Sequence, residues 1–209
     1  MSIYYHENTR TFHLTNGAVS YLMKVLPNGA LGQLYFGQAI RDREDFDHLL
    51  EMRCRPMSSC VFEGCGSFSL EHCKQEYPSC GSTDFRHPAV ELRQPNGSRI
   101  TDFVYRSHTV TSGKPPLEGL PATYCEADGE AETLTVHLED ELLQTSLYLS
   151  YTLFAGQPVL ARSARLENHG GLELHLTAAM SLSLDLPDSG YEFVHFSGAW
   201  SRERHMKVR

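Results

Sequence analysis

Carboxyl groups are the side chains best suited to cleave a glycosidic bond, and several aspartates of this chain are candidates. Glycoside hydrolysis generally uses two carboxyl groups that flank one bond, closer together in retaining enzymes than in inverting ones. The candidates are Asp84, Asp102, Asp140, Asp185 and Asp188. Most of them stand beside predicted turns or strand ends, where a carboxylate usually caps backbone N–H groups. We therefore expect no catalytic residue in this chain.

Eleven histidines are scattered along the sequence, a number that would suit a metal site. None follows another at the H-x-H or H-x-x-x-H spacing that places two ligands on one metal ion. Nucleophile-elbow, phosphate-loop and dinucleotide-binding motifs are also missing from the sequence. The sequence thus predicts neither a metal nor a cofactor.

The six cysteines do not form a recognisable metal motif. Cys125 stands alone, and the others fall within one stretch, at Cys54, Cys60, Cys65, Cys73 and Cys80. Zinc sites usually contain two short C-x₂₋₄-C pairs, whereas only Cys60 and Cys65 are that close here. We expect free, reduced thiols.

Trp200, the single tryptophan, stands in the segment SGAWSRER of residues 197–204. A flat ring beside Gly198 and two guanidinium groups, Arg202 and Arg204, can offer an apolar face to the C–H groups of a sugar. The same ring would also suit the apolar junction between two domains. The residue types alone leave both interpretations open.

The overall charge limits the partners. The formal net charge is -8, which argues against sequence-independent nucleic-acid binding, because that binding depends on basic surfaces. Residues 1–20 lack the pattern of a secretory signal, and no apolar run approaches the roughly 20 residues of a membrane span. We expect a cytoplasmic protein that does not bind membranes.

Alternation of apolar and polar residues predicts the elements that must position these side chains. Residues 143–153 and 172–186 alternate with period two, which is typical of half-buried strands. We expect the second run to be one long strand with its even-numbered residues buried. The turn at 27–29, Pro-Asn-Gly, predicts a hairpin between residues 18–26 and 31–37. Residues 43–53 are the main helical candidate. The predicted fold is all-β: one domain, residues 1–209, with two facing antiparallel sheets and at most one or two short helices.

Several long segments resemble the amino-terminal region of glycoside hydrolase family 36 α-galactosidases. They are FHLTNGAVSYLMKVLPNGALGQLYFG, KQEYPSCGSTDFRHPAVELRQPNGSRITDFVYRSHTV, GKPPLEGLPATY, LARSARLENHGG and GAWSRER, in the family's order and across nearly the whole chain. The resemblance implies a β-supersandwich beside a (β/α)₈ barrel. In that family the barrel holds both catalytic aspartates of a retaining mechanism, and it would follow Arg209.

The resemblance also implies two substrate-binding residues and a set of partners. Trp200 matches the tryptophan of a GAW-x-RER motif that approaches the galactose end of the active site. Arg53 is the nearest equivalent of a loop residue that reaches a substrate pocket, of a neighbouring subunit in oligomeric members; some members have an acidic residue there. The implied partners are α-galactosides such as melibiose and raffinose, and further copies of the chain in the full-length enzyme.

Two other functions remain alternatives. Mutarotases share the supersandwich architecture, and a free-standing sugar epimerase would need a histidine and a carboxylate facing each other, such as Glu76 with His108 or His137. A non-catalytic carbohydrate-binding or assembly module would need neither.

Overall fold

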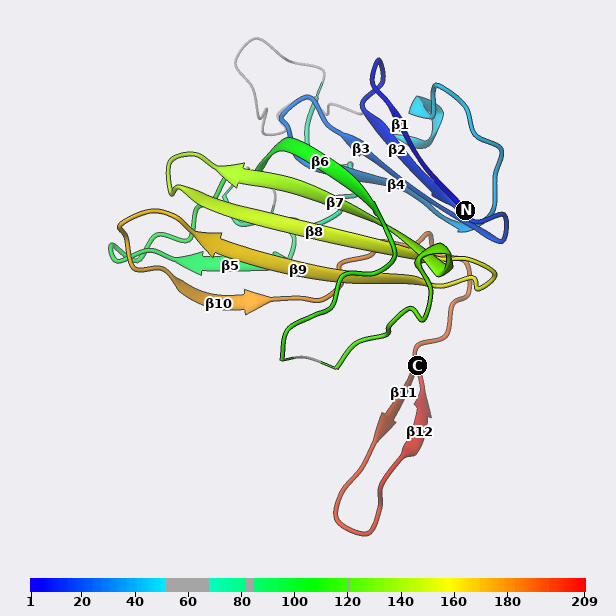
Figure 1. The fold of residues 1–209 in the computed structure, drawn as a ribbon. Coiled ribbons are helices and arrows are strands. Elements are labelled where there is room, and N and C mark those ends of the chain that lie inside the picture. Colours follow the sequence, from blue (N-terminus) through cyan, green and yellow to red (C-terminus); the bar gives the residue numbers. More distant parts are fainter. Residues whose placement is uncertain (52–67, 82–84, 120) are drawn as a thin grey trace.

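The computed structural model describes residues 1–51, 68–81, 85–119 and 121–209 (Figure 1). Their structure is almost entirely β, as predicted. One four-stranded antiparallel sheet has the order β1 (Ser2–His6), β2 (Thr11–Thr15), β3 (Val19–Val25), β4 (Leu31–Gln38). A second has the order β6 (Val104–Ser112), β7 (Ala131–Asp140), β8 (Thr145–Phe154), β9 (Leu160–Asn168). The two smaller antiparallel pairs are β5 (Val90–Arg93) with β10 (His175–Ala179), and β11 (Val194–Ser197) with β12 (His205–Val208).

The predicted hairpin is confirmed as β3 and β4. Its turn needs glycine for two reasons. Gly29 has a φ of +84°, which side-chain-bearing residues rarely adopt, and a Cβ there would lie 2.9 Å from Cβ of Val104. Asn28 completes the turn by accepting a hydrogen bond from the backbone N–H of Ala30 at 3.1 Å.

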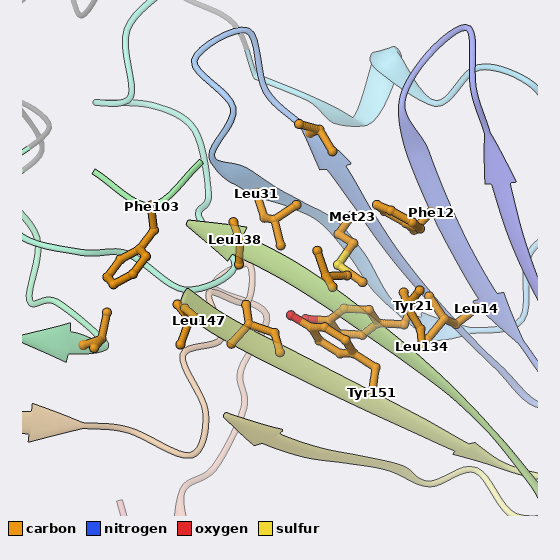
Figure 2. Close-up of a cluster of buried hydrophobic side chains, with 14 of the residues drawn as sticks. Phe12, Leu14, Tyr21, Met23, Leu31, Phe103, Leu134, Leu138, Leu147 and Tyr151 are labelled. Atoms are coloured by element: carbon orange, nitrogen blue, oxygen red, sulfur yellow. The ribbon is translucent and has the colours of Figure 1, made fainter. Parts of the chain in front are cut away.

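The main core lies between the two four-stranded sheets (Figure 2). Phe12, Leu14, Tyr21 and Met23 of β2 and β3 contribute to one side of it. The other side comes from alternate residues of β7 and β8, namely Leu134, Val136, Leu138, Leu147, Leu149, Tyr151 and Leu153. The period-two prediction for residues 143–153 is therefore confirmed, and burial of this face is the main stabilising term of the sandwich.

The second predicted strand, 172–186, is wrong in both length and burial. Only β10 forms within it, and β10 pairs with β5 instead of extending the sheet beyond β9. Most of its even-numbered apolar residues are 37–52% exposed: Leu172, Leu176, Met180, Leu182 and Leu186. Leu174 and Leu184 pack against the edge of the core. After β9 the chain leaves the four-stranded sheet, and the described residues cover only part of this apolar face. A charge at Leu176 should consequently cost this chain little.

The predicted helix at residues 43–53 is also wrong within its described part. A single 3₁₀ turn, η1 (Asp47–Leu49), is found there, and a second, η2 (Asp128–Glu130), precedes β7. Phe46 is 1% exposed and packs with Leu22 and Leu34. Leu49 and Leu50 pack against the same cluster, so the predicted apolar side exists but is formed around one 3₁₀ turn instead of a helix. No helix among the described residues is long and apolar enough to cross a bilayer.

Candidate functional site

The hairpin of β11 and β12 carries Trp200 on the loop that joins its strands and projects from the sandwich (Figure 1). The backbone N–H groups of Ala199 and Arg202 donate to each other's carbonyl oxygens at 3.2 and 2.9 Å, which closes the loop. Glu203 accepts a hydrogen bond from the N–H of Ser201 at 3.0 Å. The loop surrounds a shallow hollow lined by Trp200 together with Phe196, Gly198, Glu203 and Arg204. It thus combines an apolar ring with charged groups at its rim.

Trp200 is 94% exposed, and many other large apolar residues between Leu172 and Val208 are exposed as well. We call this set the C-terminal apolar surface: Leu172, Leu176, Met180, Leu182, Leu186, Tyr191, Phe193, Val194, Phe196, Trp200, Met206 and Val208. Soluble monomers rarely leave so many large apolar side chains of one segment in water. The surface therefore has the character of a contact face, and Trp200 is its most exposed member.

Arg53, the second predicted substrate-binding residue, lies outside the described residues, as does Asp84. Its role stays a prediction. The chain leading toward it is described up to Glu51 and is fixed to the N-terminal sheet. Lys24 forms an ion pair with Asp47, and Asn8 donates a hydrogen bond to Glu44 at 3.1 Å.

A serine, a histidine and an aspartate form a hydrogen-bonded chain that sequence reasoning missed. His13 Nδ1 lies 2.7 Å from Asp42 Oδ1, and His13 Nε2 lies 2.8 Å from Ser20 Oγ. This order of contacts resembles that of a serine-hydrolase triad. However, Ser20 is fully buried, and its oxygen also accepts the N–H of Ile40 at 3.0 Å. No substrate carbonyl can reach it, so we interpret the chain as a structural tie.

His6 joins the same aspartate, with Nε2 3.0 Å from Asp42 Oδ1. Burial raises the pKa of Asp42, but hydrogen bonds from His13 and His6 outweigh that effect, so its pKa is lowered overall. A carboxyl group whose pKa is lowered by folding stabilises the fold above its unfolded pKa. That contribution disappears as the pH falls through the lower, folded pKa.

Asp42→Asn should accordingly destabilise the chain by about 1–2 kcal/mol at pH 7, and the difference from the wild type should shrink below about pH 4. Urea denaturation at pH 7 and pH 3 measures both. Asp188→Asn, a change at an exposed residue, serves as the control. A wild-type-to-mutant difference that stays constant from pH 7 to pH 3 would rule out this role of Asp42.

Glu76 is fully buried and is not placed for an epimerase. Its oxygens accept hydrogen bonds from Tyr21 at 2.5 Å and from Tyr151 at 2.9 Å, and Arg162 lies 2.5 Å from Oε1. Burial raises the pKa of this carboxyl group, an effect that Arg162 and the two hydroxyls oppose. The protein donors around Glu76 leave no space for a sugar.

The two histidines proposed as partners of Glu76 are engaged elsewhere. His108 Nδ1 lies 2.8 Å from the hydroxyl of Tyr105, with its ring against Phe12. His137 Nε2 lies 3.0 Å from Ser146 Oγ, and its ring stacks on Tyr148. The structure thus does not assemble the histidine–carboxylate pair that the epimerase alternative requires.

The candidate aspartates behave largely as the turn-and-cap interpretation predicts. Asp140 accepts the backbone N–H groups of Asp102 and Leu143 at 2.8 and 2.9 Å. Burial, and then the charge of Asp140, raise the pKa of Asp102. Asp185 lies 3.4 Å from Arg86. These contacts hold the backbone and surface together and do not form a site around a glycosidic bond.

Of the cysteines, Cys80 and Cys125 are free thiols, whereas Cys73 is buried and contacts the carbonyl oxygens of Glu51 and Ser69, both at 3.5 Å. Cys54, Cys60 and Cys65 lie outside the described residues. Within the described part of the chain, no three histidine, cysteine or acidic side chains are grouped so that they could hold a metal ion.

Comparison with known proteins identifies the family of this chain. Residues 29–209 match the family described as the glycosyl hydrolase family 36 N-terminal domain, and the chain belongs to that family. It is 42% identical to the α-galactosidase AgaA of Geobacillus stearothermophilus, over 100% of this chain but 28% of that protein. It is 34% identical to the α-galactosidase Mel36A of Lactobacillus acidophilus, over 98% of this chain and 28% of that protein.

Solved structures agree with the sequence relatives. The family 36 α-galactosidase AgaB of Geobacillus stearothermophilus superposes with a TM-score of 0.90 and 41% identity, over 100% of this chain and 28% of that one. A structure of AgaA in complex with raffinose has a TM-score of 0.88 at 42% identity, over 95% of this chain and 28% of that one. The resemblance and the fold class inferred from the sequence are confirmed, and the chain spans about 28% of the length of these relatives.

Proposed function

We propose that this chain is the amino-terminal domain of a retaining α-galactosidase, which hydrolyses terminal α-D-galactosyl residues of sugars such as melibiose and raffinose. The observation that carries the proposal is the 42% identity to an α-galactosidase over the whole chain. The two catalytic aspartates would belong to a barrel outside residues 1–209. Within this chain, the buried Glu76 and the backbone-capping Asp140 are unsuited to that chemistry.

In this proposal the chain shapes the rim of the sugar pocket and supplies contacts to the rest of the enzyme. Trp200 would meet the sugar, because its ring is exposed and has charged groups beside it. The remaining C-terminal apolar surface would pack against the barrel, which would remove it from water. Residues 1–209 would form one domain of a cytoplasmic homo-oligomer, with Arg53 as a further contact to substrate.

The test compares the 209-residue chain with the full-length protein that contains it, using p-nitrophenyl α-galactoside. We expect turnover from the full-length protein and none above background from the chain alone, because the described residues contain no carboxylate pair positioned around a glycosidic bond. Hydrolysis by the repurified chain that a single Asp or Glu substitution abolishes would contradict the domain assignment.

Two further measurements on the 209-residue chain test the alternatives. Anomer interconversion of galactose followed by NMR would reveal an epimerase. Heat released on titration with galactose would reveal a carbohydrate-binding module that functions without a barrel. We expect neither signal. Glu76 is buried and inaccessible to a sugar, and the hollow at the Trp200 loop is shallow and open, so it would contact a sugar on one side only.

A further inference from the structure

Residues 180–193 connect β10 to the hairpin that carries Trp200, and no strand includes them. Side chains of the sandwich hold the first part of this connection. The hydroxyl of Tyr77 donates to the carbonyl oxygen of Met180 at 2.5 Å, and Gln33 accepts the N–H of Asp185 at 3.2 Å. Between these two points, Arg162 donates from Nη1 to the carbonyl oxygen of Ser183 at 3.3 Å.

Arg162 is itself held from several directions, which makes it a rigid anchor. Its other terminal nitrogen, Nη2, pairs with the buried Glu76, and its guanidinium carbon lies 5.0 Å from the centre of the Tyr151 ring. The hydroxyl of Tyr21 lies 3.4 Å from Nη1. Because the guanidinium group is planar and presents several N–H donors in fixed directions, it can satisfy Glu76 and Ser183 at the same time.

We propose that Arg162 is a positioning residue: pinned by Glu76, it fixes Ser183 on the sandwich and thereby limits where the Trp200 hairpin can lie. Asp185, two residues further on, is held by Gln33 and by an ion pair with Arg86 at 3.4 Å. With all of these anchors in place, the free tether comprises residues 186–193 instead of 180–193. A shorter tether restricts the volume that the hairpin explores, since the reach of a flexible segment grows with its length. The sugar would therefore meet a ring whose position is already restricted, which reduces the entropy lost on binding.

The first test uses Arg162→Lys in the 209-residue chain, where Trp200 is the only tryptophan and reports on the hairpin alone. A lysine ammonium can still neutralise Glu76, but it lacks the fork that reaches Ser183. We expect amide hydrogen exchange at Asp185, whose N–H donates to Gln33, to accelerate roughly three- to tenfold, because loss of the neighbouring bond from Arg162 to Ser183 loosens this part of the connection. The fluorescence anisotropy of Trp200 should fall, while exchange in β7 and β8 stays unchanged.

Arg165→Lys is the matched control. Arg165 lies on the same strand, but it is exposed and stacks on Tyr148 with its guanidinium carbon 4.2 Å from the ring centre. It should leave both readouts unchanged. Tyr77→Phe keeps the pair of Arg162 with Glu76 and removes only the bond to Met180. It should loosen residues 180–185 to a smaller degree, and it provides a milder variant if Arg162→Lys fails to fold.

Unchanged anisotropy and exchange in both Arg162→Lys and Tyr77→Phe would overturn the inference. So would equal changes in Arg162→Lys and Arg165→Lys. Anisotropy and hydrogen exchange are measured without sugar. Their results therefore test the positioning role of Arg162 independently of the proposed function.

The link to substrate rests on the proposed function and is tested in the full-length protein. We expect Arg162→Lys to raise KM for p-nitrophenyl α-galactoside several-fold, with kcat within roughly twofold, because the hairpin must be ordered when sugar binds. A loosened hairpin with unchanged KM would overturn positioning for substrate. If Trp200→Ala also left KM unchanged, the failure would instead lie in the assignment of Trp200 to the sugar pocket.

Discussion

Arg162→Met is expected to lower the free energy of unfolding by about 3–5 kcal/mol, because it leaves the carboxylate of Glu76 buried without its positive partner. Glu76 has no exposed surface, and the Arg162 side chain is only 9% exposed. The hydroxyls of Tyr21 and Tyr151 still donate to the carboxylate, but neither neutralises it. Urea denaturation of the 209-residue chain at pH 7 measures the loss.

A matched control and a double mutant isolate the pair. Arg165→Met removes a side chain of the same type at an exposed position of β9 and should cost well under about 1 kcal/mol. The double mutant Glu76→Gln, Arg162→Met should lose less unfolding free energy than the sum of the two single mutants. Each single substitution leaves the other partner buried with an unpaired charge, whereas the double mutant leaves none. Additive losses, or equal losses for Arg162→Met and Arg165→Met, would show that the pair is not coupled.

The Glu76 cluster joins parts of the chain that the sheets do not join. Tyr21 comes from β3 of the first sheet, Tyr151 and Arg162 come from β8 and β9 of the second, and Glu76 lies in the connection before β5. Apolar packing between the sheets gives cohesion but little directional preference. The two hydrogen bonds and the ion pair of Glu76 are directional. They can fix the position of each sheet and of the connecting segment relative to the others.

The strand pattern could be read from the sequence wherever one sheet face is covered by this chain itself. For β8 and for the hairpin of β3 and β4, local alternation and the Pro27-Asn28-Gly29 turn were sufficient, because the information lies within a few residues. The run at 172–186 alternates equally well, but alternation predicts which residues share a face and not what covers that face. The described residues leave most of it exposed.

The polar clusters could not be predicted, because their members are distant in sequence. Asp42 meets His13 across 29 residues, and Glu76 meets Arg162 only through the packing of a loop against two sheets. Without a register for every strand, any of several acids was an equal candidate for any histidine. Trp200 could be nominated as a substrate-binding residue from the sequence for a different reason: the tryptophan is unique, and its motif is short and local. Its contact with the sugar stays a prediction.

Trp200→Ala in the full-length protein is expected to raise KM for an α-galactoside roughly tenfold, with a smaller effect on kcat. An aromatic contact contributes about 0.5–1.5 kcal/mol to binding in addition to the free energy of burying its apolar area. A tenfold weaker affinity corresponds to about 1.4 kcal/mol, which is of that size. In the 209-residue chain the same change should leave the melting temperature unaltered, because a ring that is 94% exposed has little packing to lose.

Phe85→Ala provides the matched control, since Phe85 is 92% exposed and lies outside the hairpin. It should change neither KM nor the melting temperature. If Trp200 is instead an aromatic of a domain junction, Trp200→Ala will lower the melting temperature of the full-length protein while KM stays at the wild-type value. That combination would remove Trp200 from the sugar site. A raised KM with an unchanged melting temperature can arise only if the ring acts on the sugar, directly or by shaping the rim that holds it.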